Sequence, residues 1–222
     1  MGELSSLLTA GFTGLISGLL LSIPVGPVNL TIINEGTRRG FFWAAMIGLG
    51  ATAMEVAYCA AAFTGFASLF GGRLVKAAME LISFVFLLYL GIKFLLARGL
   101  TAVSKIEERI EEKLHPHSAF MIGFVRVMGN PGVLVFWIIL AANFISREWV
   151  EPTLRSKLAC VTGVALGTGI WFLGLSYAVS LGHRKLSEKT LVRMEHISGI
   201  ALILLALIHG GSIIWQMAHH KV

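Results

Sequence analysis

Residues 22–32 read SIPVGPVNLTI, and they interrupt an otherwise apolar run that extends from Leu7 to Ile33. The interruption holds two prolines, a glycine and an asparagine. Proline lacks a backbone N–H and clashes with the preceding helical turn, so it disrupts a helix interior but suits the first position of a new helix. We therefore expect one helix to end in this stretch and another to begin at Pro27, with Gly26 as its N-cap.

The composition places this interruption in a lipid bilayer. Of the 222 residues, 56% are hydrophobic and 14% are charged, whereas a soluble domain has about 25% charged residues. Apolar runs of about 20 residues are long enough to cross hydrocarbon, and they do so as helices because a helix satisfies its own backbone. The composition predicts an all-α membrane protein. The net charge of +6 fits basic residues that flank membrane helices, so it indicates no nucleic-acid partner.

The apolar runs predict six transmembrane helices. Their expected ranges are 7–34, 41–70, 75–97, 118–145, 158–182 and 197–217. The first run is too long for a signal peptide and has no basic residue before it, so we expect it to be retained. The long polar connection after the third run has charges spaced by three and four, which predicts a solvated surface helix. The chain then divides into residues 1–98, a cytoplasmic linker 99–117 and residues 118–222, which form one transport domain overall.

The fourth expected span carries a second interruption, Asn130-Pro131-Gly132. Pro27 precedes Pro131 by 104 positions, and each break is followed by a glycine-rich helix and then by a more regular one. Three spans per half is an odd number, so the second half must run upside down, as in the inverted repeats of many secondary transporters. Two separate proline kinks are the alternative, but the matching places of the breaks favour two inverted three-helix repeats with broken first helices.

Helices that begin inside a membrane place unpaired backbone N–H groups and positive dipole ends there. Such ends bind anions, so the two helix starts are expected to hold a substrate carboxylate between them. The candidate substrate-binding residues at the breaks and beside them are Pro24, Gly26, Pro27, Asn29, Glu55, Arg126, Asn130 and Pro131.

Two of these candidates are ionisable residues inside expected spans. A charged side chain costs roughly 2.5 to 3.5 kcal/mol at the bilayer centre on insertion scales, so it tends to have a task. Glu55 lies near the middle of the second span, and it either holds a substrate ammonium, exchanges a proton or pairs with Arg126. Arg126 would repel a cationic substrate, which favours a neutral or small one. Lys93 is close enough to its span end to reach the interface.

Several short motifs spread through the chain form a recognisable set. They are Pro24-Val-Gly-Pro-Val-Asn29, Gly36-Thr-Arg-Arg-Gly40, Gly50-Ala-Thr-Ala-Met-Glu55, Leu88-Tyr-Leu-Gly-Ile-Lys93, Gly123-Phe124, Asn130-Pro131 and Asn143-Phe-Ile145. Together they resemble the lysine exporter and homoserine/threonine exporter family of bacterial amino-acid efflux proteins. Glu55 stands where an aspartate is usual in that family, and Arg126 where an apolar residue is usual. The resemblance implies export of an amino acid across a bacterial inner membrane, driven by the proton gradient or the membrane potential.

The sequence leaves two alternatives to amino-acid export. One is divalent-metal efflux with Glu55 and His209 as ligands, and the other is an intramembrane thiol–disulfide carrier that uses Cys59 and Cys160. Enzyme motifs are absent from the sequence, which has no His-Glu-x-x-His helix, nucleophile elbow or phosphate loop. We therefore expect no catalytic residue, no cofactor and no metal ligand.

Basic residues in the connections predict the orientation. The first, third and fifth connections carry ten Lys and Arg residues, and the remaining connections and ends carry six. The more basic side faces the cytoplasm by the positive-inside rule, so both termini are expected in the periplasm. Spacings of small residues, such as Gly14 with Gly18 and Gly163 with Gly167, permit close helix contacts, and they leave open whether these lie within one chain or in a homodimer.

Overall fold

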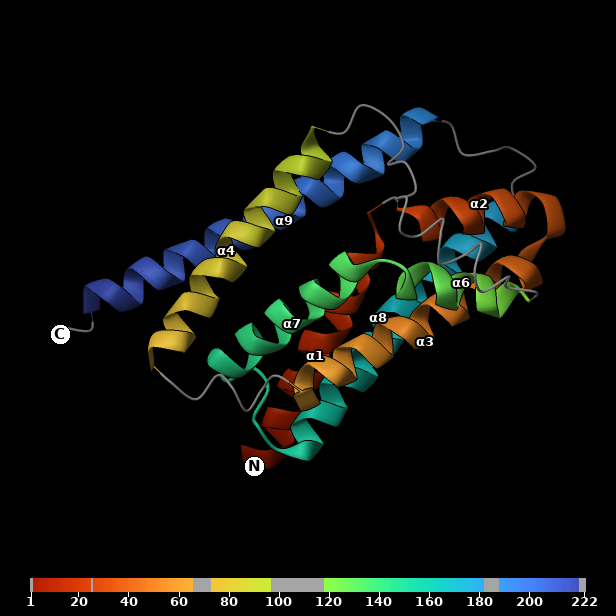
Figure 1. The fold of residues 1–222 in the computed structure, drawn as a ribbon. Coiled ribbons are helices and arrows are strands. Elements are labelled where there is room, and N and C mark those ends of the chain that lie inside the picture. The colour runs from red at the N-terminus through yellow and green to blue at the C-terminus, as the bar shows by residue number, and fades with distance from the viewer. Residues whose placement is uncertain (1, 25, 66–72, 97–117, 182–187, 220–222) are drawn as a thin grey trace.

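The computed structural model of the chain describes residues 2–24, 26–65, 73–96, 118–181 and 188–219. The elements in these ranges are all α-helices, which confirms the expected all-α class (Figure 1). The predicted surface helix and linker at 99–117 lie outside the described residues. In chain order the helices are α1 (Gly2–Ser22), α2 (Pro27–Arg39), α3 (Phe41–Gly65), α4 (Arg73–Leu95), α6 (Ala119–Met128), α7 (Pro131–Ser146), α8 (Leu154–Leu181) and α9 (Glu188–His219).

Both interruptions begin a new helix where the sequence predicts it. α2 starts at Pro27 with Gly26 as its N-cap, and α7 starts at Pro131 with Asn130 as its N-cap. The proline sits in each case in the first turn, where its missing N–H breaks no helical hydrogen bond. α6 and α7 are bent by 67° at their break. The predicted N-caps are therefore confirmed.

Three helices of the described residues are long and apolar enough to cross a membrane, namely α1, α3 and α8. The bent pair α6 and α7 adds a fourth crossing if the two helices count as one span. α4 and α9 contain shorter apolar stretches, Phe84–Leu95 and Glu195–Ile208. Large apolar side chains of α8 are exposed, among them Leu158, Leu166 and Ile170, as expected of a surface that faces lipid. The chain is thus a multi-pass membrane protein, and six spans stay a prediction.

Close backbone contacts hold α1 against α8 and α3 against α6. An added Cβ at Gly14 of α1 would collide with the backbone of α8, and one at Gly163 of α8 would collide with the backbone of α1. Gly50 of α3 and Gly123 of α6 have the same relation to each other's helices. In lipid, where helix association depends on van der Waals packing, glycines at these positions let the helices approach closely.

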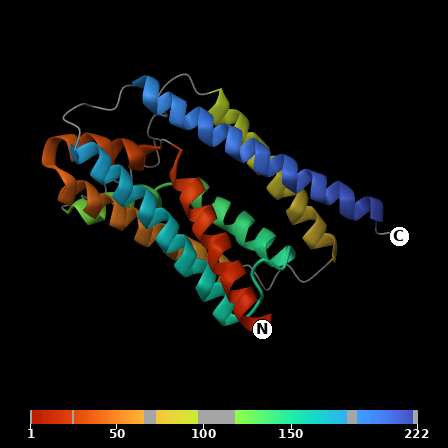
Figure 2. The ribbon, with the colours of Figure 1, turned by 180° about the vertical axis from the view of Figure 1, so that it is seen from behind.

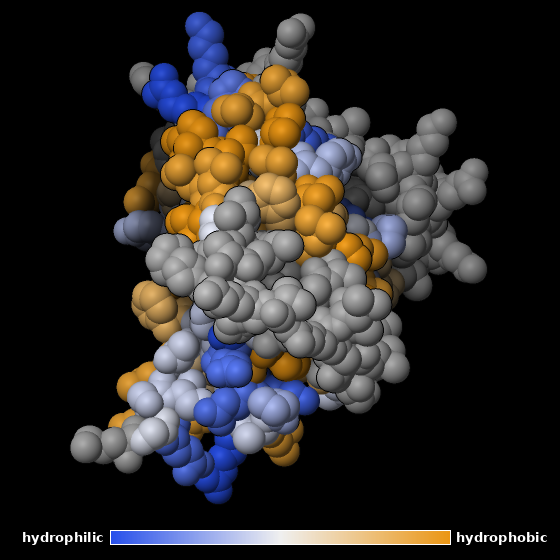
Figure 3. Space-filling model, turned by 90° about the vertical axis from the view of Figure 1, so that its left-hand side faces the viewer, coloured by the Kyte–Doolittle hydropathy of each residue, from blue (hydrophilic) through white to orange (hydrophobic). Residues whose placement is uncertain are grey.

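α4 and α9 form a separate pair that lies along one side of the other helices (Figures 1 and 2). Gly91 of α4 and Gly199 of α9 face each other in this pair. An added Cβ at either glycine would lie within 3.0 Å of the carbonyl oxygen of the other. The pair touches the remaining helices through contacts of α4 with α7. Figure 3 shows one face of the molecule, on which hydrophobic residues form a broad area and hydrophilic residues gather mainly below it.

A tight turn sends the chain from α2 into α3. Gly40 has a φ of +85°, in the left-handed region that favours glycine, and its N–H donates to the carbonyl of Gly36. Before the turn, Arg39 pairs with Glu35 at 3.0 Å and lies 4.6 Å from the ring centroid of Trp43. The turn and these contacts fix the far end of α2, so its first turn can face the interior.

Candidate functional site

A cavity of about 370 Å³ lies at the two helix starts. Every described helix contributes to its wall, so the cavity is central to the fold. Its wall combines charged side chains, the residues of the two breaks and a set of apolar side chains.

The structure brings most of the predicted site residues to this one cavity. Seven of the eight line it: Pro24, Gly26, Pro27, Asn29, Glu55, Arg126 and Asn130. Pro131 does not line the cavity, although its neighbours on both sides do. Its part in the fold is to start α7. Whether the gathered residues bind a substrate stays a prediction.

The first break is held by the side chain of Asn29, which is 3% exposed. Its amide nitrogen donates to the carbonyl of Ser22 at 2.8 Å and to that of Pro24 at 2.6 Å. Its amide oxygen accepts from the indole N–H of Trp171 on α8 at 3.1 Å. Carbonyls at the end of α1 lack helical partners, and a buried carbonyl without a partner is costly. Asn29 therefore joins α1, α2 and α8 around the break.

The second break is held by Asn130 in a different way. Its side-chain oxygen accepts from the N–H of Gly132 at 3.0 Å, and its carbonyl accepts from the N–H of Val133 at 3.1 Å. At the start of α2, by contrast, Gly26 has no side chain that could cap the helix. In α2 the N–H of Val28 has no acceptor among the described residues, and that of Leu30 donates to Gly26. The start of α2 therefore offers a backbone donor to the cavity.

Glu55 enters the cavity from α3 and is held by Trp137 of α7, whose indole N–H donates to the Oε2 atom of Glu55. Trp137 is fully buried. Trp137 is thus a hydrogen-bond partner of Glu55. Sequence reasoning missed Trp137, although a buried indole N–H in a membrane needs an acceptor. Trp137 also lies two turns after Asn130, on the helix face that meets the cavity.

Three charged side chains line the cavity, and they come from three helices. Glu55 is on α3, Arg126 on α6 and Lys93 near the end of α4. The two cations exceed the one carboxylate, and the N-terminal end of α2 adds a positive partial charge. Lys93 was expected only to reach the membrane interface, and the structure adds it to the cavity wall. The charged residues of the cavity wall are therefore of both signs.

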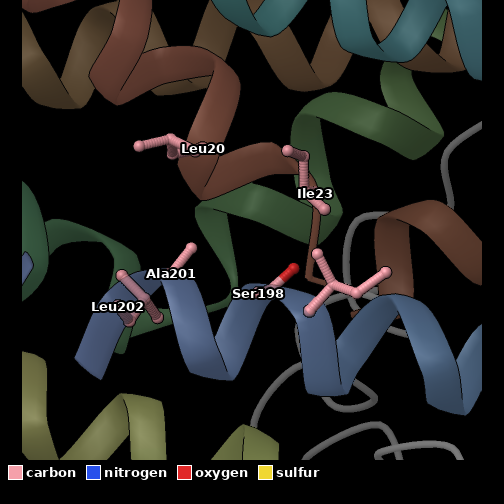
Figure 4. A pocket seen from close by; sticks show the side chains of 6 residues that line it. Leu20, Ile23, Ser198, Ala201 and Leu202 are labelled. Carbon is pink, nitrogen blue, oxygen red and sulfur yellow. The ribbon is translucent and has the colours of Figure 1, made fainter. Parts of the chain in front are cut away.

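A second and smaller cavity of about 60 Å³ lies between the end of α1 and the middle of α9 (Figure 4). Leu20 and Ile23 face Ser198, Ala201 and Leu202 across it. The lining is apolar except for one hydroxyl. The space is about one sixth of the large cavity, which it adjoins through the shared residue Leu202. It is too small for a polar metabolite.

The described residues bear on both alternative chemistries. They include no group of three or more His, Cys, Asp and Glu side chains that could hold a metal ion. The side chain of His209 lies outside the described residues. Cys59 of α3 and Cys160 of α8 are both buried, and their thiols are hydrogen-bonded to each other without a disulfide. Neither cysteine lines the cavity.

Comparisons with known proteins give a family. The model of the family described as "LysE type translocator" matches residues 19–209. A protein of Bacillus subtilis (strain 168), named "Putative amino acid efflux protein YcgF", is 26% identical over 201 residues, which cover 88% of this chain and 92% of that protein. No solved structure matches the chain. The match to the family model covers most of the chain and confirms the resemblance found in the sequence. This chain therefore belongs to the LysE type translocator family and is a transport protein, not an enzyme.

Proposed function

We propose that this protein exports an amino acid, which binds as a zwitterion in the large cavity. The observation that carries the proposal is that both interrupted helices begin in this cavity, together with one carboxylate and two cations. A zwitterion has one group of each sign, so it suits a wall of mixed charge. The name of the Bacillus subtilis relative, an amino acid efflux protein, supports the direction and the substrate class.

The substrate carboxylate is expected at the start of α2. The N–H of Val28 is available there, Gly26 presents no side chain that would block the approach, and the dipole end favours an anion. Arg126 supplies a full positive charge from α6 and can make a bidentate pair with a carboxylate. The start of α7 contributes its dipole but fewer donors, because Asn130 occupies them.

The substrate ammonium is expected at Glu55. The indole of Trp137 leaves the second oxygen of the Glu55 carboxylate for a further partner. If substrate leaves, a proton could neutralise the carboxylate in its place, which would couple export to the proton gradient. The alternative of coupling to the membrane potential requires that a net charge crosses the membrane together with the neutral zwitterion, so it predicts that export depends on voltage and on the ion that carries this charge.

For the architecture we propose six spans in two inverted repeats, residues 1–98 and 118–222, joined by a cytoplasmic linker at 99–117. The helix pairings support this division. α1 packs on α8 as α6 packs on α3, and α2 contacts α8 as α7 contacts α3. If α1, α2 and α3 correspond to α6, α7 and α8, each of these contacts has its counterpart with the two halves exchanged. The proposed setting is a bacterial inner membrane with both termini in the periplasm, as the basic residues indicate.

The test is transport in liposomes. The purified protein is reconstituted, loaded with a mixture of unlabelled amino acids, and assayed for uptake of each radiolabelled amino acid by exchange. We expect exchange of at least one amino acid, and a loss of at least about tenfold in Glu55→Gln. Glu151→Gln, an exposed carboxylate outside the cavity, is the matched control and should keep full exchange. Exchange of divalent cations without that of any amino acid would overturn the proposal.

A further inference from the structure

The cavity has a continuous apolar side that a zwitterionic backbone does not need. Phe86, Leu90 and Phe94 follow each other at spacings of four on α4, so they lie on one face of that helix. Val133 and Phe136 of α7 line the cavity as well. Packing joins these residues into one cluster, in which the rings of Phe86 and Phe136 have centroids 5.5 Å apart.

The apolar lining also includes residues of two further helices. Leu21 at the end of α1 and Leu202 of α9 line the cavity and belong to the same packed cluster. The named set, which we term the side-chain subsite, is Leu21, Phe86, Leu90, Phe94, Val133, Phe136 and Leu202. The residues assigned above to the substrate's charged groups lie on α2, α3 and α6 instead. Most of the apolar lining thus comes from α4 and α7, whereas the charged side chains Glu55 and Arg126 come from α3 and α6, and Lys93 is the charged residue on α4.

We propose that the transported amino acid has a large apolar side chain, such as that of leucine, isoleucine, methionine or phenylalanine. The proposal rests on the proposed function, because it assumes that the carboxylate and the ammonium bind at the residues assigned to them above. A side chain of this kind fills the subsite with carbon atoms that match its wall. Alanine would leave most of the subsite unfilled, and a volume of about 370 Å³ is far more than so small a molecule occupies.

Lys93 adds a second criterion. It is the one charged residue among those that α4 contributes to the cavity. A lysine or arginine substrate would bring a second cation next to Lys93 and Arg126, and like charges placed together are disfavoured. The same wall would also have to desolvate the end of that side chain without an acceptor. The subsite thus selects against the cationic amino acids by repulsion and by desolvation.

The test compares amino acids as competitors in proteoliposomes that contain the intact chain. Exchange of radiolabelled leucine is measured against increasing unlabelled phenylalanine, methionine, alanine, glutamate and lysine. We expect phenylalanine and methionine to compete with leucine, and alanine and lysine to need at least about tenfold higher concentrations, since the loss of even one methylene from an apolar pocket changes selectivity by about 10- to 200-fold. Exchange of alanine, glutamate or lysine in preference to leucine would overturn the inference while leaving amino-acid export intact. No exchange of any amino acid would overturn both.

Variants locate the preference on the subsite. Leu90→Ala should lower the ratio of leucine to alanine exchange, in kcat/KM, by about 10- to 100-fold. Leu90→Met conserves volume and should keep the ratio within about threefold. Leu166→Ala, on the exposed face of α8 and outside the cavity, is the matched control and should leave the ratio unchanged. An unchanged ratio in Leu90→Ala, with exchange retained, would place the preference elsewhere and contradict the inference.

Discussion

The two interrupted helices, α1 with α2 and α6 with α7, meet the same requirement with different residues. In both, a proline starts the second helix in the cavity. At the second break, Asn130 acts forward, and its side chain and carbonyl accept from the first N–H groups of α7. At the first break, Asn29 acts backward from inside α2, and its amide donates to the carbonyls left at the end of α1.

The difference has a functional meaning. The cap by Asn130, which we term the forward cap, uses the first backbone N–H groups of α7, so few remain for a ligand. The hydrogen bonds from Asn29 to the carbonyls before α2, which we term the backward hold, leave the N–H of Val28 in α2 facing the cavity. In the proposed function the mechanical task and the binding task are therefore separated: α7 is closed by its own cap, and the N–H of Val28 in α2 is the donor proposed for the substrate carboxylate. The predictions below disturb one break at a time.

The largest effect is expected for Asn29→Ala. The substitution removes two donors and one acceptor from a buried place. It leaves the carbonyl of Ser22 and the indole N–H of Trp171 without partners, whereas the carbonyl of Pro24 keeps the N–H of Gly26 as a donor. Burying such groups unsatisfied destabilises a protein by about 1 to 3 kcal/mol. We expect a loss of about 2 to 3 kcal/mol in the free energy of unfolding, measured by SDS titration in mixed micelles.

The control for this change is Asn34→Ala, on the exposed face of the same helix, where the side chain is accessible to the surroundings. It should alter the free energy of unfolding by less than about 0.5 kcal/mol. Equal effects of the two substitutions would contradict the backward hold, because Asn29 would then contribute no more than any asparagine in α2.

The second largest effect is expected for Asn130→Ala. Loss of a side-chain N-cap destabilises a helix start by about 1 kcal/mol. The hydrogen bond that the carbonyl of Asn130 accepts from the N–H of Val133 remains, so the loss in the free energy of unfolding should be smaller than in Asn29→Ala. Asn130→Ser restores a capping oxygen and should recover most of the stability in the same SDS titration. Failure of serine to recover it would mean that the amide nitrogen, not the cap, matters.

The sequence predicts the breaks well because their cause is local. The geometry of proline determines that a helix begins at Pro27 and at Pro131, and a charged residue in an apolar run, such as Glu55, is conspicuous whatever its neighbours are. Both kinds of signal need only a few adjacent residues. This is why seven of the eight predicted site residues meet at one cavity.

The sequence does not predict the partners across helices. Trp137 meets Glu55 over 82 positions, and Trp171 meets Asn29 over 142. From the sequence, a tryptophan in an apolar run is as consistent with a residue that faces lipid as with one that faces the interior, because its ring is apolar and the polar N–H is small. Whether such a tryptophan faces lipid or the interior depends on how α3, α7 and α8 pack together. The periodicity of a single segment gives no information about that packing.

A smaller effect is expected for Trp171→Phe, which removes the indole donor to Asn29 but keeps an aromatic ring. Hydrogen bonds between helices in membranes contribute about 0.6 kcal/mol on average. We expect a loss of about that size in the free energy of unfolding, with Asn29 still bound to its two carbonyls. Trp137→Phe is the companion at Glu55, and it should lower amino-acid exchange more than Trp171→Phe does. A reversed order would indicate that the Asn29 side, not the Glu55 side, governs transport.

The smallest change in stability, and the sharpest test of the comparison, is expected for Gly26→Ser. Gly26 has a φ of −94° and a ψ of −175°, which any residue adopts, and an added Cβ there meets no atom within 4 Å. Serine would give α2 the forward cap that α7 has, and serine exceeds glycine as an N-cap by a few tenths of a kcal/mol. The free energy of unfolding should therefore rise slightly.

The same substitution should weaken transport. The hydroxyl would occupy a backbone donor assigned here to the substrate carboxylate, so the KM for exchange should rise severalfold while stability does not fall. Gly169→Ser on α8, where an added Cβ also meets no atom within 4 Å, is the matched control and should leave the KM unchanged. If Gly26→Ser leaves the KM unchanged as well, the open start of α2 does not hold the carboxylate, and the two breaks differ in mechanics alone.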